Sequence, residues 1–123
     1  MKPAISDEVI TEKLQRAFNV PVFVGFAPED ELKRLKTYNY FILRPASITG
    51  QNAGRYTQNI TITRVYEGVE DLQEIEIINA LSEINLREHE NVVQYNILRK
   101  GETDNYCDVL TFSFARGLRS GRC

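Results

Sequence analysis

The stretch FILRPASITGQNAGRYTQNITITRVY, residues 41–66, decides the fold, because it sets two strand-like runs on either side of a polar segment. Both runs are rich in β-branched and aromatic residues, which favour strands. In residues 56–66, Ile60 and Ile62 alternate with threonines, and this pattern predicts a strand with one packed face and one exposed face. Residues 45–56 are too polar for a core and too long for a tight hairpin turn. We therefore expect a long loop between the second and third strands.

Amphipathic helices are predicted on both sides of this region. Residues 6–18 (SDEVITEKLQRAF) begin with Ser6, a good N-cap, and place their apolar residues at helical spacing. Residues 69–86 (VEDLQEIEIINALSEINL) form the second predicted helix, with acidic residues in the first turns, where the helix dipole favours them. A shorter stretch, residues 27–37 (APEDELKRLKT), is compatible with one or two helical turns.

The remaining strands complete an α+β fold. Residues 20–26 (VPVFVGF) read as a short first strand, and residues 91–100 and 106–116 alternate on both sides of a turn that contains Gly, Asp and Asn. The order predicts a mainly antiparallel sheet of about four to five strands, with two helices packed on one face. We expect a single domain over residues 1–116 and a flexible, basic tail over residues 117–123.

Composition is that of an ordinary globular protein. The chain has 123 residues, 42% hydrophobic and 26% charged, which is enough to bury a core without disulfides or metals. No apolar run has the ~20 residues of a membrane span, and the N-terminus does not resemble a signal peptide. We expect the protein to stay in the cytoplasm of the cell that makes it, with both cysteines reduced.

Reactive groups are few. His89 is the only histidine, and Cys107 and Cys123 have no metal-ligand spacing. The segment around Gly54 is glycine-bearing, but Arg55 and a strand follow it, whereas a phosphate-binding loop leads into a helix. No motif of a hydrolase or metalloenzyme is present. The sequence therefore predicts a protein that is not an enzyme and has no cofactor and no metal.

Charge is arranged in two blocks although the net charge is only -2. Residues 32–66 contain six basic residues and no acid, whereas residues 67–90 contain eight acids and one arginine. If these segments lie on opposite flanks, the positive side of one subunit meets the negative side of the next in a head-to-tail contact that can close into a ring. A polar loop of about a dozen residues is usually functional or disordered, and we interpret this loop as a docking element.

The order of elements resembles that of the tail terminator proteins of long-tailed bacteriophages, also called tail completion or tail-to-head joining proteins. The resemblance covers about residues 6–116 and is one of layout: the N-terminal helix, VPVFVGF, APEDE, YNYFILRP, YTQNITITRVYEG, EDLQEIEIINAL and a final hairpin that ends in LTFSFAR. The family has no catalytic motif that could be matched residue by residue.

The resemblance implies a structural virion protein. Such a protein forms a ring, expected here to be a hexamer, at the head-proximal end of the tail tube. It stops tube polymerisation and joins the tail to the connector and neck proteins of the head. It is assembled in the cytoplasm of the host bacterium, and DNA only passes through it. From charge and loop position we predict two sets of contact residues: Arg44, Gln51, Asn52 and Arg55 for the docking loop, and Arg64 with Glu70, Asp71 and Glu74 for the contact between subunits.

Alternatives remain open at the level of sequence. Another neck, head-completion or minor tail component would have a similar size and symmetry. In a different class, a small nucleic-acid-binding or ligand-binding α+β domain would use the tyrosines and arginines to stack and hold bases. The acidic block speaks against nucleic acid, because it would repel phosphates. An enzyme would need a deep pocket that gathers His89 with a carboxylate or Cys107.

Overall fold

The computed structural model describes residues 2–50, 56–68 and 71–119. Three helices and six strands follow one another along this part of the chain. In chain order they are β1 (Lys2–Pro3), α1 (Asp7–Phe18), β2 (Val22–Val24), α2 (Glu29–Lys33), β3 (Asn39–Gly50), β4 (Tyr56–Tyr66), α3 (Glu74–Ser82), β5 (Arg87–Arg99) and β6 (Tyr106–Arg119).

All six strands belong to one mixed sheet with the order β1-β6-β4-β3-β2, and β5 lies beside β6 on the same side as β1. Every pair is antiparallel except β2 with β3, which is parallel. The predicted α+β class is confirmed. The sheet has six strands and there are three helices, more than expected, because two-residue β1 and five-residue α2 are too short to leave a clear sequence pattern.

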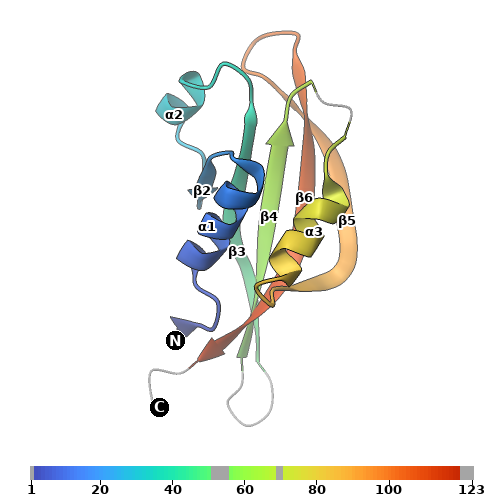
Figure 1. Ribbon diagram of the computed structural model, residues 1–123. Helices are drawn as coiled ribbons and strands as arrows, with labels where there is room; N and C mark the ends of the chain where they lie inside the picture. The colour runs from blue at the N-terminus through green and yellow to red at the C-terminus, as the bar shows by residue number, and fades with distance from the viewer. Residues whose placement is uncertain (1, 51–55, 69–70, 120–123) are drawn as a thin grey trace.

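The main core lies between the sheet and the two longer helices. α1 and α3 lie side by side on the same face of the sheet (Figure 1). α1 begins as predicted, because the Ser6 hydroxyl accepts a hydrogen bond from the Val9 N–H at 3.3 Å. Its apolar stripe meets alternate residues of the three central strands. The fully buried members include Ile10, Leu14, Phe41, Leu43, Ile60, Ile62, Ile77, Leu81, Leu110, Phe112 and Phe114.

The opposite face of the sheet carries a second, smaller core. Tyr40, Val65 and Cys107 are buried there, and Leu32 and Leu35 from the segment around α2 pack against them. The predicted pair of helices on one face is therefore correct for α1 and α3, while the α2 segment covers one end of the other face.

The second long helix is shorter than predicted. α3 covers nine residues, Glu74–Ser82, and not residues 69–86. Gln73 at its start and Asn85 after its end adopt left-handed backbone conformations, with φ of 58° and 64°. An α-helix cannot continue through such a residue, so the helical pattern in the flanking sequence does not extend the helix. Residues 69–70 lie outside the described part of the chain.

The predicted long loop is largely strand, which is a correction. β3 continues to Gly50 and pairs with β4 from Tyr56 onward, with a bulge between Pro45 and Ser47. The side-chain amide of Asn59 donates to the hydroxyls of Ser47 at 2.8 Å and Thr49 at 3.3 Å. Polar residues at these positions therefore bond across the strands, and the sequence misled us because their polarity is also typical of loops.

The first three residues of the predicted flexible tail are strand, whereas residues 120–123 lie outside the described part of the chain. Residues 117–119 belong to β6, and Leu118 and Arg119 pair with Pro3 and Lys2 of β1. The Ala4 N–H donates to the Gly117 carbonyl at 2.8 Å. The N-terminus thus supplies the backbone partner that keeps this stretch extended, a long-range contact that the sequence does not reveal.

Candidate interaction surfaces

The predicted docking residues are only partly within the described structure. Arg44 is exposed on β3, six residues before the strand ends at Gly50. Gln51, Asn52 and Arg55 lie outside the described residues. Ile48, on the same strand, is 58% exposed, so the C-terminal half of β3 presents both a cation and an apolar side chain to solvent.

Arg64 is buried, contrary to what a subunit contact would require. Its relative exposure is 1%. The guanidinium carbon lies 5.2 Å from the ring centre of Phe18, 4.8 Å from that of Phe41 and 4.2 Å from that of Tyr66. In this conformation the side chain presents almost no surface to another molecule.

The hydrogen bonding of Arg64 is incomplete. Nη2 donates to Asn39 Oδ1 at 3.1 Å, while Nε and Nη1 have no hydrogen-bond partner among the described residues. Burial lowers the pKa of Arg64 from its usual value, and interaction with Tyr66 partly opposes this shift. The aromatic rings therefore take over part of the stabilisation that water gives an exposed guanidinium.

The predicted acidic partners of Arg64 lie elsewhere or outside the described residues. Glu70 belongs to the undescribed part. Asp71 Oδ1 accepts the Gln73 N–H at 2.9 Å just before α3, and Glu74 Oε2 accepts the Tyr95 hydroxyl at 2.6 Å. Both carboxylates thus make contacts within their own subunit, and their contact with Arg64 of a neighbouring subunit stays a prediction.

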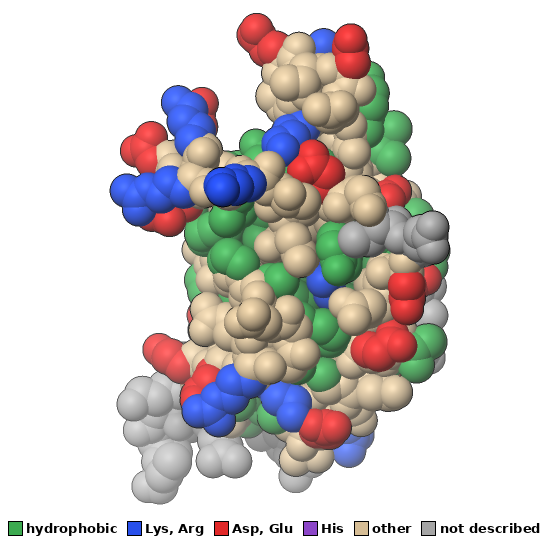
Figure 2. Space-filling model, turned by 45° about the horizontal axis from the view of Figure 1, so that its top comes forward, with side chains coloured by type: hydrophobic (Ala, Val, Ile, Leu, Met, Phe, Trp, Pro, Cys, Tyr) green, Lys and Arg blue, Asp and Glu red, His purple; other side chains and the backbone are tan. Residues whose placement is uncertain are grey.

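The basic block of the sequence does not form a basic flank. Lys33 lies 3.9 Å from Glu29 within α2, and Arg34, the residue after α2, lies 3.6 Å from Glu31. Figure 2 accordingly shows blue and red side chains next to one another on the projecting α2 segment. Since Arg64 is also buried, the sum of charge along a segment overstates the charge that the surface presents.

A half-buried ion pair that the sequence did not indicate joins the β5–β6 hairpin to the rest of the sheet. Lys100 Nζ lies 3.0 Å from Glu67 Oε1, 3.2 Å from the Lys36 carbonyl and 4.9 Å from the ring centre of Tyr38. The hydrogen bond from Lys100, with a further one from the Tyr38 N–H, lowers the pKa of Glu67. The two partners are 33 residues apart in sequence, so periodicity could not have found them.

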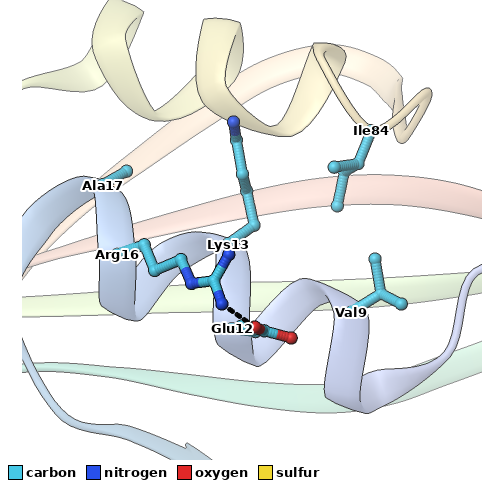
Figure 3. Close-up of a pocket in the computed structure, with 6 residues that line it drawn as sticks. All are labelled: Val9, Glu12, Lys13, Arg16, Ala17 and Ile84. Atoms are coloured by element: carbon cyan, nitrogen blue, oxygen red, sulfur yellow. Dashed lines mark ion pairs between the residues drawn. The ribbon is translucent and has the colours of Figure 1, made fainter.

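The hollows on the helix face do not gather reactive groups. A groove of about 440 Å³ between α1 and α3 is lined by Val9, Ile84 and charged residues of α1 (Figure 3). There Lys13 pairs with Glu83, the residue after α3, and Arg16 pairs with Glu12 one helical turn away. These charges neutralise one another across or along the groove.

The candidate nucleophile and base are far apart. Cys107 is buried on β6, and burial raises the pKa of its thiol. His89 follows Glu88, which pairs with Phe114, and Phe114 lies seven residues along β6 from Cys107, which corresponds to roughly 23 Å. Among the described residues no group of three His, Cys, Asp or Glu could hold a metal ion, and no helix there is long and apolar enough to cross a membrane.

Exposed apolar side chains instead gather at the two margins of the sheet. Val24 on β2 is 51% exposed, and Phe26, just beyond it, is 70% exposed. At the other margin Tyr95 and Ile97 of β5 are 64% and 65% exposed, and Ile75 of α3 is 64% exposed. Large apolar residues left exposed at the ends of a sheet are typical of contact surfaces.

Neither a scan against protein-family models nor a search of curated protein sequences finds a match to this chain.

Proposed function

We propose that this protein is a structural component of a bacteriophage tail, a tail terminator that assembles into a ring at the head-proximal end of the tail tube. Its partners are further copies of itself, the tail tube protein and the connector or neck proteins of the head. Its role is to stop tube polymerisation and to join tail to head, with DNA as passing cargo. The proposal includes a location in the virion and no catalytic activity.

The observation that carries this proposal is the pair of open sheet margins. β2 and β5 end the sheet on opposite sides, and both carry exposed apolar residues. A protein with two different exposed apolar margins can associate head to tail, the margin of one copy binding the other margin of the next. Such contacts generate a ring when the rotation between successive copies closes on itself. The layout of the elements, which resembles that of tail terminators, gives the ring its place in the tail.

Docking to the tail tube or connector is assigned to the end of the β3–β4 hairpin. Arg44 and Ile48 are exposed on this hairpin, and it projects beyond the helices at the lower end of the sheet (Figure 1). Gln51, Asn52 and Arg55, which lie outside the described residues, remain predicted docking residues. A protruding hairpin can reach a neighbouring ring without disturbing the core that holds the subunit together.

Two measurements test the proposal. Negative-stain electron microscopy of the purified protein is expected to show rings of uniform diameter. Virions made without the protein are expected to have tails of uncontrolled length, or tails detached from heads. Attached tails of normal length in such virions would refute the assigned role, whatever the purified protein assembles into.

A further inference from the structure

The two outer strands of the sheet have unpaired edges. Among the described residues, β2 pairs with no strand other than β3, through Val22–Val24, and β5 pairs with no strand other than β6, within Arg87–Arg99. β1 covers the end of β6 beyond β5 and leaves the outer side of β5 open. An outer edge presents backbone N–H and C=O groups that another strand can bind.

The two edges lie at the same height across the sheet. One row of directly paired residues crosses the five strands β2, β3, β4, β6 and β5. It consists of Val22, Phe41, Arg64, Leu110 and Tyr95. A second row does the same two residues further along: Val24, Leu43, Ile62, Phe112 and Val93. Val22–Val24 of one margin is thus level with Val93–Tyr95 of the other.

The backbone groups in these rows point outward on both margins. Phe41 N–H donates to Pro21 O, and Gly25 N–H donates to Leu43 O, so alternate residues of β2, namely Val22 and Val24, face away from the sheet. The same alternation, carried across the antiparallel pairs, directs the N–H and C=O groups of Tyr95 and Val93 outward.

Strand direction fits as well. β2 runs parallel to β3, and the three antiparallel pairs from β3 to β5 leave β5 opposite in direction to β2. A rotation about an axis along the strands keeps these directions. The β5 edge of one copy therefore meets the β2 edge of the next copy as an antiparallel pair, which needs no change of conformation.

The exposed side chains of the two margins lie on one face. Val22 and Val93 both pack at the border of the core beneath the helices, so residues of the same two rows share that face. Tyr95 and Val24, 64% and 51% exposed, would be covered in the pair. Cross-strand contacts between aromatic and β-branched residues are among the stabilising ones in sheets.

The alternative open edge is blunted. Beyond β2, the stretch Arg44–Gly50 of β3 also lacks an outer neighbour, but Pro45 has no N–H and a bulge follows it. Proline and bulges are devices that keep an edge from pairing. β5 has a register shift of its own between Glu88 and Val93, but residues 93–99 contain no proline and pair with β6 without a shift, so this part of the edge is open to pairing.

Charge is complementary at the lower end of the same two margins. Arg87, at the start of β5, pairs with Ala115, next to Arg116, whose Nη1 lies 2.7 Å from Asp7 Oδ1. Asp7 and Glu8 belong to the side of α1 that lines a hollow with Val24 of β2. The β5 margin thus brings the exposed Arg87 to about the height of Asp7 and Glu8. Since Arg116 of the same subunit already neutralises Asp7, the exposed Glu8 is the carboxylate that Arg87 of a neighbouring copy would meet.

We propose that the occupant of the β5 edge is a second copy of this chain: β5 of one subunit pairs antiparallel with β2 of the next, with Tyr95 opposite Val22 and Val93 opposite Val24. The inference rests on the proposed ring and specifies how its subunits join. Repeated around the ring, the contact links the sheets of all copies through backbone hydrogen bonds.

Engineered disulfides test the register directly. The double variant Val24→Cys/Val93→Cys, in a Cys123→Ser background, places two thiols across the proposed pair, where Cα atoms are about 5.5 Å apart and a disulfide can form. The matched control is Val24→Cys/Arg99→Cys, whose second thiol is displaced by roughly 20 Å along β5. Each single variant is included, and circular dichroism verifies that all variants fold.

After mild oxidation, the matched variant is expected to give a ladder of covalent oligomers on a denaturing gel, with about tenfold more product than the displaced control. Equal products from both variants, or no product at a concentration where light scattering shows oligomers, would overturn the edge pairing and leave the ring itself standing. A covalent dimer from the Val93→Cys single variant would assign the edge to β5 of a second copy instead. A wild-type protein that stays monomeric at millimolar concentration would refute ring and pairing together.

Discussion

Replacement of Arg64 by methionine is expected to stabilise the subunit. Arg64 is 1% exposed, makes one hydrogen bond to Asn39 and touches three aromatic rings. Burying a charge costs several kcal/mol even after the surroundings relax. The hydrogen bond returns about 1.5–3 kcal/mol and the desolvated ring contacts about 2 kcal/mol, so the terms nearly cancel.

Methionine changes this balance because it carries no charge to desolvate. Its burial contributes about 1.5–3 kcal/mol, and sulfur packs well against aromatic rings. We expect Arg64→Met to raise the free energy of unfolding by about 1–2 kcal/mol, or the melting temperature by roughly 3–10 °C. Arg64→Ala, the matched control, leaves a cavity and is expected to lose about 2–5 kcal/mol.

The measurement is urea unfolding followed by far-ultraviolet circular dichroism, since the chain has no tryptophan. A loss with methionine as large as the loss with alanine would refute the reasoning and show that the guanidinium itself holds the core together. Light scattering on the same variants tests the predicted subunit contact of Arg64. A stabilised Arg64→Met variant that no longer assembles would mean that this arginine leaves the core in the ring.

Three further predictions concern the subunit alone. Ser6→Ala removes the hydrogen bond to the Val9 N–H and is expected to cost about 1 kcal/mol in thermal unfolding, which Ser6→Asp should largely restore. Lys100→Met should cost about 1 kcal/mol at pH 7. Because the pKa of Glu67 is lowered from 4.5 in the folded state, the stability contributed by its pair with Lys100 is present above that value and is lost as pH falls below it. The gap between wild type and variant in urea should therefore close in acid, and a gap of constant size would contradict the assigned pair. Burial raises the pKa of Tyr40 to about 12. The stability that the neutral Tyr40 hydroxyl contributes is therefore fully present below pH 10 and is lost as pH rises toward 12. Tyr40→Phe should be less sensitive to this alkaline range, and equal loss in both proteins would exclude Tyr40 as the cause.

Local signals in the sequence predicted the elements whose patterns are long and regular. α1 was located by its N-cap serine and apolar stripe, and the β5–β6 hairpin by its turn residues and alternation. Both signals act within a few residues, so they survive in a single sequence. The α+β class, the mainly antiparallel pairing of the strands and the shared face of α1 and α3 follow from them.

Elements that depend on a distant partner were missed. Residues 45–50 are strand because Asn59 and its neighbours pair with them, and residues 117–119 are strand because β1 lies beside them. In isolation both stretches have the polar, glycine-bearing composition of loops and tails. The competing long-range backbone pairing overrides that local preference.

Charge was the least reliable guide to the candidate surface, because the sequence does not say which charges are buried or paired. Lys33 and Arg34 are paired on α2, and Arg64 lies inside the core, so half of the six basic residues in the predicted block contribute little to an outer flank. The charge blocks were counted over residues 32–66 and 67–90, so they did not include the carboxylates of α1, which lie beside Val24 of β2. A segment's charge becomes a surface charge only after the fold has placed each side chain.

The β5 margin shows what strand order adds to a pattern. The run from Tyr95 to Leu98 is typical of a strand with apolar residues on both faces, which would be unremarkable in the centre of a sheet. Strand order places it at the margin, where Tyr95, Ile97 and Leu98 remain 64%, 65% and 41% exposed. An edge strand that has the residue types of a central strand avoids unwanted pairing only if a partner strand covers its outer edge. The contradiction between composition and place is resolved if the sheet continues into a neighbouring subunit, so the open edge is itself an argument for assembly.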